Sequence, residues 1–381
     1  MRKSLLFSLL LYLCPLIIFA QVKELWINKP VSDWPQIALI NQVLYKNGDR
    51  YIDPSFKYAG TGFLIDNGRD TLAATAKHIL WIAKNKKVNG TEVNADLSQW
   101  VMTTKGNTTD SVLVGRLLNE DPDERLEGSS STILERDWLV FSVKKSSPKL
   151  YPLKPRYTPV KAGEKVYILS CAYEDSTSTV YNGTVYRKLG MDILIRHDMG
   201  NQKPGSSGSP VIDADGYLIG IISSGTTIDV GEVAVAISTE YLKDVLDKKP
   251  GLNEPKKDYG ELVFNTAMEH GTVRAIKQYK SLTKNPGNYY IYNLRSANRN
   301  GLLETGQRLL NMKRYQDTIE ILKFNIKAEG KFYPYYNLLA KAQLLSGNKR
   351  EAAESYRLSI KSYDGKENEA YTELEKLNKE L

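Results

Sequence analysis

The sequence predicts a two-part protein, an all-β domain followed by an all-α domain of helical repeats. From about residue 55 to 240, short runs of Val, Ile, Leu and Tyr are broken by Gly, Asn, Asp and Pro, without long helical patterns between them. Such runs are typical of a β-barrel or β-sandwich. Beyond about residue 255 the hydrophobic period becomes helical, and similar side chains recur every 34 positions. With 381 residues, the chain is also longer than one typical core requires.

The N-terminus predicts an export signal. Basic residues at positions 2 and 3 precede an apolar run from Leu5 to Phe19, and Ala20 offers a cleavage site. The run is short for a membrane span. We therefore expect residues 1–20 to be removed, leaving a periplasmic or secreted protein with no stable membrane span. The alternatives are a retained anchor and a lipid on Cys14, although apolar residues follow that cysteine.

Composition excludes several classes of protein. Hydrophobic residues make up 41% and charged residues 25%, as in ordinary soluble globular proteins. The net charge of +8 comes without a dense Lys/Arg stripe interleaved with aromatics, so no nucleic-acid partner is expected. After signal cleavage only Cys171 remains, so no disulfide forms within the chain, and we expect a small buried side chain there. No Cys/His cluster has metal-ligand spacing, so neither metal nor cofactor is expected.

The β region contains several clear apolar runs, of which six are examples, and one long loop. The runs, each expected to be a strand, are residues 62–65, 112–114, 138–143, 165–169, 193–195 and 217–222. The polar stretch 119–132 is expected to be a surface loop. Residues 238–247 are expected to form a helix that ends the β domain, and the Lys-, Pro- and Gly-containing stretch 248–255 a linker.

The helical region contains an internal repeat. Five residues recur 34 positions later: Gly306, Leu309, Thr318, Leu322 and Asn325 correspond to Ala340, Gln343, Ala352, Tyr356 and Ser359. This period resembles tetratricopeptide repeats, whose helix pairs bury their apolar faces only by stacking on neighbours. A generic helical bundle is the alternative. The predicted division is a β domain over 21–247, a linker with a divergent helical pair over 248–300, and repeats over 301–381.

Three short segments contain the candidate catalytic residues. Ala73-Ala-Thr-Ala-Lys-His78 ends in a histidine, Asp137 precedes an alternating strand, and Pro204-Gly-Ser-Ser-Gly-Ser-Pro-Val211 contains Ser207 between two glycines. A hydroxyl nucleophile needs an adjacent base and an anion site. Gly205 lets the backbone turn, so that its own amide and that of Ser207 can face one oxyanion. We further expect Gly208 to leave room for substrate, and Pro210 to start a strand.

The order His, Asp, Ser and the local motifs resemble the trypsin-like peptidases. Thr75-Ala-Lys-His78 corresponds to the family's Thr-Ala-x-His, and Gly205 to Pro210 to its Gly-x-Ser-Gly-[Gly/Ser]-Pro. The likeness spans about residues 35–245, and in texture it is nearest to bacterial glutamyl endopeptidases and HtrA-type proteases. It implies a double β-barrel in which Ser207 is the nucleophile, His78 the base and Asp137 its orienting acid.

Other residues compete for two of these roles. His270 falls in the helical part, and His197 lies ten residues before the nucleophile, in an expected pocket wall. Asp110, Asp121 and Asp123 fall in or beside loop segments, whereas Asp137 begins a strand that is expected to be buried. We therefore prefer His78 as base and Asp137 as acid.

The resemblance also indicates where substrate binds and where the chain departs from the family. Ser206 stands where trypsin has an Asp that pairs with a newly cut N-terminus, so that activation switch is not expected. Asn201 is placed at the base of the first pocket and, being neutral, argues against a strong Lys/Arg preference. Ser223, Ser224 and Gly225 are expected to pair with an extended substrate backbone. Glutamyl endopeptidases have a pocket histidine where this chain has Ile222, which weakens a Glu-specific interpretation unless His197 substitutes.

Together these features predict an exported serine endopeptidase whose polypeptide substrate, or a separate protein partner, docks on the helical repeats. Two alternatives stay open at this stage. One is a binding or scaffold protein with a protease fold that acts through its repeats. The other is a non-peptidic esterase, which needs the same catalytic groups.

Overall fold

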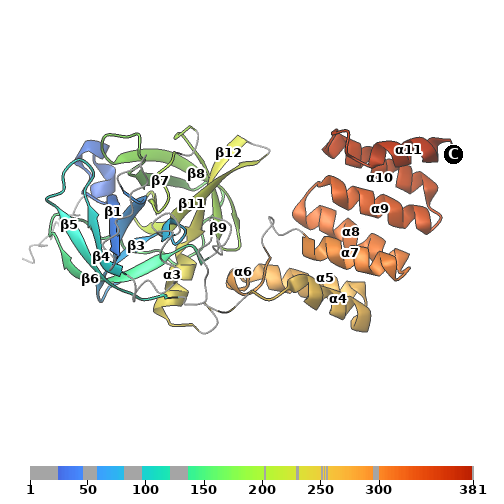
Figure 1. The fold of residues 1–381 in the computed structure, drawn as a ribbon, viewed down its shortest axis with the longest axis horizontal. Coiled ribbons are helices and arrows are strands. Elements are labelled where there is room, and N and C mark those ends of the chain that lie inside the picture. The colour runs from blue at the N-terminus through green and yellow to red at the C-terminus, as the bar shows by residue number, and fades with distance from the viewer. Residues whose placement is uncertain are drawn as a thin grey trace, which may run out of the picture.

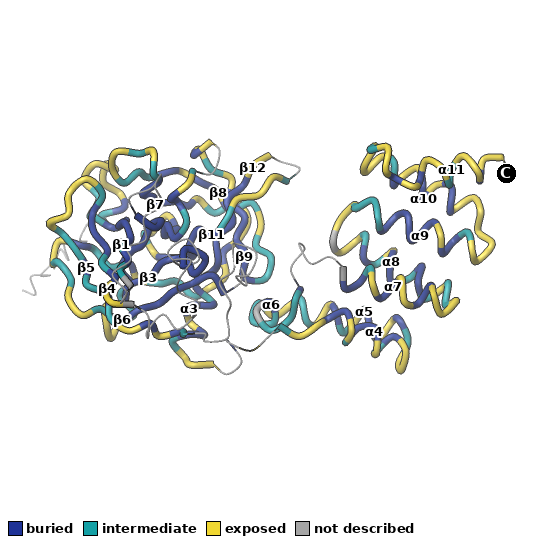
Figure 2. The backbone as a smooth tube through the Cα atoms, viewed as in Figure 1, coloured by how far each residue is buried: buried dark blue, intermediate teal, exposed yellow. Residues whose placement is uncertain are grey.

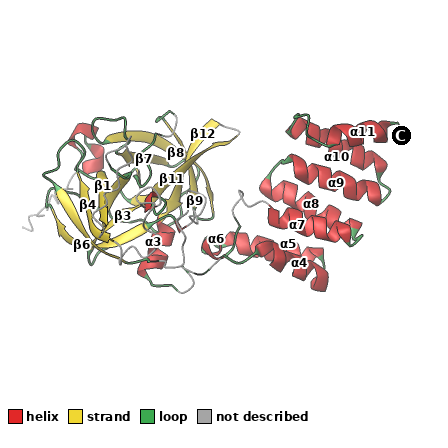
Figure 3. Ribbon diagram, viewed as in Figure 1, coloured by secondary structure: helices red, strands yellow, loops and turns green. Residues whose placement is uncertain are grey.

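The computed structural model describes residues 25–45, 58–80, 97–120, 136–200, 203–228, 231–249, 252, 254, 256–294 and 300–379. A β domain is followed by a helical domain, as predicted (Figures 1 and 3). The expected export signal and most of the expected loop 119–132 lie outside the described residues. In the part of the chain that is described, no helix has both the length and the apolar character needed to cross a membrane.

The first half of the β domain is a closed antiparallel barrel in the order β1-β2-β3-β6-β5-β4. Its strands are β1 (Leu39–Tyr45), β2 (Thr61–Asp66), β3 (Thr71–Thr75), β4 (Leu97–Thr103), β5 (Ser111–Leu117) and β6 (Leu139–Ser146). Its core contains Phe63, Trp100 and Phe141, and the Trp100 and Phe141 rings lie 4.8 Å apart. Large aromatic side chains of this kind supply much of the apolar area that a small barrel can bury.

The second half is another closed antiparallel barrel, in the order β10-β11-β12-β9-β8-β7. Its strands are β7 (Lys165–Ser170), β8 (Thr179–Leu189), β9 (Asp192–His197), β10 (Pro210–Asp213), β11 (Leu218–Ile228) and β12 (Gly231–Ser238). Its core consists mainly of aliphatic side chains such as Ile168, Ile193 and Ile222. Helix α3 (Thr239–Leu246) follows, and the Ser238 side chain caps it by accepting a hydrogen bond from the Glu240 amide.

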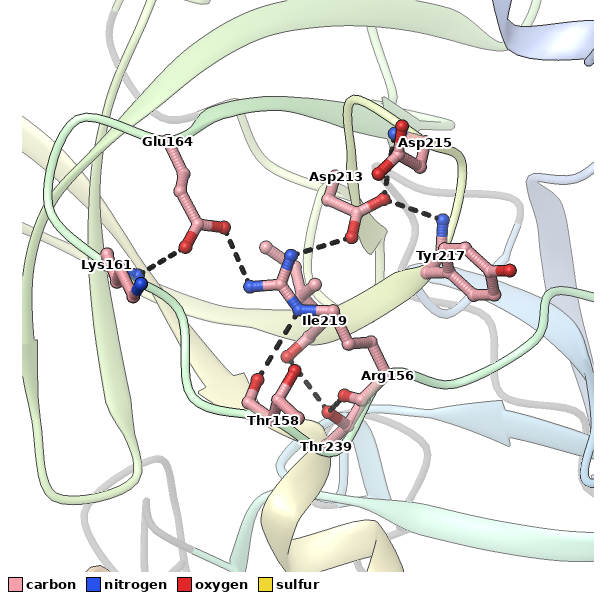
Figure 4. Close-up of polar contacts among 9 residues, drawn as sticks. All are labelled: Arg156, Thr158, Lys161, Glu164, Asp213, Asp215, Tyr217, Ile219 and Thr239. Carbon is pink, nitrogen blue, oxygen red and sulfur yellow. Dashed lines mark hydrogen bonds and ion pairs between the residues drawn. The ribbon is translucent and has the colours of Figure 1, made fainter.

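The segment that joins the two barrels is fixed by an ion-pair cluster around Arg156 (Figure 4). The guanidinium binds Asp213 at 2.8 Å and Glu164 at 2.7 Å. The Thr239 hydroxyl donates to the carbonyl of the same arginine. This cluster connects the inter-barrel segment to β10 and to the first turn of α3.

The helical domain consists of stacked antiparallel pairs (Figure 1). Its described helices are α4 (Tyr259–His270), α5 (Thr272–Lys284), α6 (Asn288–Ile291), α7 (Asn300–Asn311), α8 (Tyr315–Glu329), α9 (Tyr333–Leu345), α10 (Lys349–Ser362) and α11 (Ala370–Asn378). Helices α8 and α10 begin at 315 and 349, one repeat of 34 residues apart. All ten residues of the predicted repeat are buried, so the period arises from helix-pair stacking (Figure 2).

The expected linker contacts the β domain. Leu252 is buried in the large core cluster that includes the first barrel and α3, and the Glu254 carbonyl accepts a hydrogen bond from the Arg136 guanidinium at 2.8 Å. Further along, the Tyr289 ring of α6 packs on the turn between β8 and β9. A Cβ atom on Gly190 in that turn would lie 2.2 Å from the ring. The first helices after the linker are therefore joined to the second barrel by a tight contact.

Candidate active site

The two barrels each contribute part of the site. Strand β3 pairs with β6 so that Thr75 lies opposite Leu139. Because the pairing is antiparallel, the residues just after β3 and just before β6 meet at one end of the first barrel. His78 and Asp137 stand at these two positions. Ser207 comes from the second barrel, in the segment between β9 and β10.

The three side chains form a continuous hydrogen-bonded series. His78 Nδ1 lies 2.7 Å from Asp137 Oδ2, and the His78 backbone amide donates to Asp137 Oδ1, also at 2.7 Å. The other ring nitrogen, Nε2, lies 2.8 Å from Ser207 Oγ. Asp137 is fully buried and Ser207 is half-buried. In the tautomer whose Nδ1 donates to Asp137, Nε2 accepts the hydroxyl proton of Ser207.

The electrostatics of the pair favour a charged carboxylate beside an imidazole that protonates readily. Burial alone would lower the pKa of His78, but the charge and hydrogen bond of Asp137 outweigh it and raise that pKa above 6.5. Burial would raise the pKa of Asp137, but His78, Ser223 and the His78 amide lower it below its usual 3.8. The arrangement therefore has the properties of a general base next to a nucleophile.

Ser223 has a role that sequence reasoning missed. Its hydroxyl donates to Asp137 Oδ2, and its side chain is buried. From the sequence it was expected to present backbone to substrate, together with Ser224 and Gly225, all within β11. The sequence carries no clear signal for this contact, because Ser223 is followed in β11 by Ser, Gly and two Thr residues.

The amide of Gly205 points into the expected oxyanion position. The Pro204 carbonyl accepts a hydrogen bond from the Tyr173 amide at 2.9 Å. Because carbonyl and amide point in opposite directions in a trans peptide, the Gly205 N–H faces away from Tyr173. Gly205 has φ +91°, and a Cβ there would lie 2.8 Å from the Tyr173 nitrogen. Only glycine fits this turn without strain.

The amide of Ser207 is oriented in the same way. The Ser206 carbonyl accepts from the Ser209 amide at 3.0 Å, which directs the Ser207 N–H to the opposite side. Within the described residues, neither the Gly205 amide nor the Ser207 amide has a protein acceptor. Two amides without a protein acceptor, next to the Ser207 hydroxyl, are the donors that an anion site requires.

Gly208 has a different function from the one expected. It has φ +85°, and a Cβ there would lie 2.0 Å from the Thr61 carbonyl oxygen of the first barrel. The glycine thus lets the two barrels approach each other, and the space it leaves is filled by protein. Pro210 begins β10 as predicted.

The competing titratable residues lie elsewhere. His197 ends β9, and its Nδ1 accepts from the Met199 amide at 3.3 Å. Burial lowers the pKa of His197 despite the nearby carboxylates. His270 is exposed at the end of α4, and Asp110 accepts from the Ser147 hydroxyl at 2.7 Å. Asn201, Asp121 and Asp123 fall outside the described residues.

A pocket of about 320 Å³ opens beside the nucleophile. It is lined by Lys203, Pro204, Ser207, Gly225, Thr226, Thr227 and Glu232. The Lys203 ammonium is paired with Glu174 at 2.7 Å and Asp175 at 3.1 Å. The pocket therefore combines a compensated cation, one carboxylate and the hydroxyls of β11.

Cys171 follows β7 and is buried, as expected. Its side chain is a free thiol, and burial raises its pKa to about 12. Such a thiol is unreactive at neutral pH. The described residues include no group of three or more His, Cys, Asp or Glu side chains arranged to hold a metal ion.

Comparison with known proteins gives one family match and several structural likenesses. Among curated proteins, no sequence matches the chain. Among solved structures, the chain is similar to the active form of the Rv3671c protease from M. tuberculosis, with 18% identity and a TM-score of 0.38, covering 59% of this chain and 86% of that one. An inactive mutant of the same protease gives 17% identity and a TM-score of 0.36, with 58% and 89% covered. Residues 60–221 match the family model of the trypsin-like peptidase domain, and the two closed six-stranded barrels have the fold that this match implies.

Proposed function

We propose that this protein is an exported serine endopeptidase that hydrolyses peptide bonds through an acyl-enzyme. The observation that supports this most directly is the series Asp137–His78–Ser207, with contacts of 2.7 and 2.8 Å. The two unpaired amides beside the nucleophile complete what acyl transfer requires. A scaffold protein acting only through its repeats would have no use for this arrangement.

The reaction follows from the geometry. Ser207 Oγ attacks the scissile carbonyl carbon while its proton passes to His78 Nε2. The oxyanion of the tetrahedral intermediate accepts hydrogen bonds from the amides of Gly205 and Ser207. His78 then gives its proton to the leaving amine nitrogen, the C–N bond breaks, and an ester to Ser207 remains. Water attacks this ester, His78 takes the water proton, and the same proton returns to Ser207 Oγ.

Asp137 serves this cycle without exchanging a proton. It accepts hydrogen bonds from both the ring and the backbone amide of His78, which fix the imidazole orientation. Its charge stabilises the imidazolium that forms in each half-reaction. Because its own pKa is lowered, it stays ionised throughout.

An extended substrate has an open strand edge to pair with. Strand β10 pairs with β11 only as far as Ile221, and beyond it the Ile222 backbone bonds to Ser209 and Gly208. Further along, residues 224–228 pair with β12 on one side. The opposite edge of β11 there is the proposed place for substrate backbone at Ser224 and Gly225, next to the pocket.

A fluorophosphonate probe separates this function from its alternatives. The wild-type protein, produced without residues 1–20, should be labelled at Ser207, and the Ser207→Ala variant should not. If the wild-type protein also cleaves members of a peptide library, the function is that of a peptidase. Labelling together with hydrolysis of simple esters but of no peptide would favour the esterase, and an absence of labelling would favour the scaffold protein.

We propose further that the helical repeats, which we take to be tetratricopeptide-like, dock a polypeptide. The structure has a groove of about 610 Å³ that is lined by Leu303, Glu304, Gln307, Tyr333, Pro334, Asn337, Leu338, Lys341, Glu367 and Glu369. Three carboxylates face one ammonium there, so a basic segment fits best. Tyr333 lines this groove, whereas Tyr335 and Tyr336 on the same helix are buried in packing.

Charge substitution in the groove tests the docking role in the full chain. Glu304→Gln with Glu369→Gln should reduce cleavage of a basic protein substrate severalfold and leave short-peptide turnover unchanged. The matched control is Glu354→Gln with Glu375→Gln, because these glutamates lie on the same helical domain in exposed ion pairs outside the groove. Equal rates for both double variants would remove the docking proposal while leaving the peptidase untouched.

A further inference from the structure

Thr61, the first residue of β2, bonds from the first barrel to the nucleophile segment of the second. It is fully buried. Its amide donates to the Ser207 carbonyl at 2.8 Å, and its hydroxyl donates to the Gly205 carbonyl at 2.9 Å. The same hydroxyl accepts from the Cys171 amide at 3.0 Å. One residue therefore binds the carbonyls of both residues whose amides form the anion site.

These contacts determine which way the two amides point. Thr61 holds the carbonyls of Gly205 and Ser207, and so the peptide units that follow these two residues. The peptide units that precede them are held by the amides of Tyr173 and Ser209, which bond to the carbonyls of Pro204 and Ser206. With the units on either side held, the Gly205 and Ser207 N–H groups have no freedom to turn away from an oxyanion. Only the bond from the Thr61 hydroxyl depends on a side chain, so only that one is specified by residue type.

Loss of this hydroxyl would leave two buried groups without partners. The Cys171 amide and the Gly205 carbonyl both bond to it, and both residues are buried. A buried donor or acceptor that has no partner destabilises the conformation that leaves it unpaired. The Gly205 peptide could regain a partner by rotating, because glycine permits many backbone conformations. Such a rotation would move its amide out of the anion site.

The residue before the nucleophile shows that this loop is held without an activation cut. Ser206 is buried, and its hydroxyl donates to the Lys203 carbonyl at 2.7 Å, within the same turn. A neutral serine bonded inside its own loop needs no newly formed N-terminal ammonium as a partner. Among the described residues, the side chain from outside the loop that bonds to the backbone of residues 205–207 is that of Thr61.

We propose that Thr61 is a positioning residue whose hydroxyl holds the oxyanion loop in its competent form as soon as the two barrels have folded together. This rests on the proposed peptidase function and deepens it by making the site constitutively assembled. Barrel closure, which brings Thr61 to Gly205, takes the place of a proteolytic activation step.

Substitution at Thr61 tests this against a merely structural role. Thr61→Val keeps the side-chain shape but removes both hydroxyl bonds, and Thr61→Ser keeps them. We expect Thr61→Val to lower kcat by about ten- to a hundredfold, since misplacing one oxyanion donor has effects of this order. The affinity for a peptide aldehyde, whose adduct occupies the anion site, should fall by the same factor, with KM within about twofold. Thr61→Ser should stay within about threefold of wild type in all three quantities.

Thr239→Val is the matched control for general destabilisation. Thr239 is also a buried threonine whose hydroxyl donates to a backbone carbonyl, but it lies at the start of α3, away from the loop. The Thr239→Val substitution should lower the melting temperature of the protein without changing kcat or the affinity for the aldehyde. If Thr61→Val does not fold, Thr61→Cys takes its place, because a cysteine side chain is similar in volume to threonine and its thiol is only a weak hydrogen-bond donor. The same loss of kcat and of aldehyde affinity is expected.

Two results would overturn the inference. The first is a folded Thr61→Val variant whose kcat and aldehyde affinity stay within twofold of the wild-type values. The second is an increase in activity of tenfold or more when a removable tag fused ahead of residue 21 is cut off. Failure of the proposed peptidase function would show differently, because wild type itself would then take up no fluorophosphonate.

Discussion

Ser223 donates its hydroxyl to Asp137 Oδ2, the same carboxylate oxygen that receives Nδ1 of His78. The carboxylate thus has three donors, two from His78 and one from the strand that also borders the substrate edge. We expect Ser223→Ala to lower kcat about tenfold, because Asp137 keeps its contacts to His78 but loses one bond to a buried charge. Kinetics on a peptide ester and a peptide amide would show it. An unchanged kcat would mean that the two His78 contacts suffice.

The pH dependence of kcat/KM should have an acid limb above pH 6.5. The base must be neutral to accept the Ser207 proton, and its pKa is raised by Asp137. Activity is therefore lost as pH falls through this raised pKa. In Asp137→Asn the raising influence disappears while burial remains, so the limb should move below 6.5 as kcat falls by about 10⁴. A limb that stays in place in Asp137→Asn would assign the titration to another group.

The contributions of His78 and Asp137 to the free energy of unfolding depend on pH in opposite directions. The folded pKa of His78 is raised, so its contribution is complete below the unfolded value and is lost as pH rises through the folded one. The folded pKa of Asp137 is lowered, so its contribution is present above 3.8 and is lost as pH falls through the folded value. Thermal melts of wild type and His78→Ala across pH 3–9 should differ most on the acid side of His78 titration.

Arg156 is expected to be the most important charged residue for the stability of the peptidase domain. Its guanidinium neutralises Asp213, whose side chain is 5% exposed, and also binds Glu164 (Figure 4). Arg156→Met would leave Asp213 buried with backbone amides alone, at a cost of about 2 kcal/mol. A melting temperature lower by about 5 °C is expected. Lys161→Met, on the same surface loop, is the control and should melt like wild type.

The carboxylate of Glu232 should give the pocket beside Ser207 a modest preference for basic side chains. The other charge there, Lys203, is already paired with two carboxylates. Glu232 is exposed, so its attraction is screened and about three- to fivefold in kcat/KM is expected. Glu232→Gln should reduce cleavage after Lys by that factor and leave cleavage after Leu unchanged. Glu354→Gln on α10, outside this pocket, is the control. If Glu232→Gln and wild type give the same peptide-library profile, a residue other than Glu232 determines the preference.

Local patterns predicted the two-part fold and the three side chains that meet in the candidate site, because each depends on neighbouring residues. The repeat of 34 residues records which helix faces are buried, and the segments around His78, Asp137 and Ser207 have characteristic spacing. Contacts that form between the two barrels join residues far apart in the chain, so they leave no local pattern in the sequence. Thr61 and Gly205 are 144 residues apart, and the space at Gly208 is set by the opposite barrel. On α9, residue type alone could not distinguish the buried rings of Tyr335 and Tyr336 from that of Tyr333, which lines the groove.

The contact between Tyr289 and Gly190 predicts how firmly the helical domain is joined to the barrels. Tyr289 is 3% exposed, and its ring lies flat against the glycine turn between β8 and β9. Tyr289→Ala should remove most of this packing, at a cost of about 3 kcal/mol locally. Because the active site lies between the barrels, turnover of short peptides should not change. Limited proteolysis between α3 and α4 should become several times faster, because the linker then keeps its contacts at Leu252 and Glu254 but loses the support of the Tyr289 packing. Tyr371→Ala on α11, where the ring is 43% exposed, should leave the proteolysis rate unchanged. If Tyr289→Ala instead abolishes peptide turnover, the helices are a structural part of the peptidase and the repeats are not a separable docking domain.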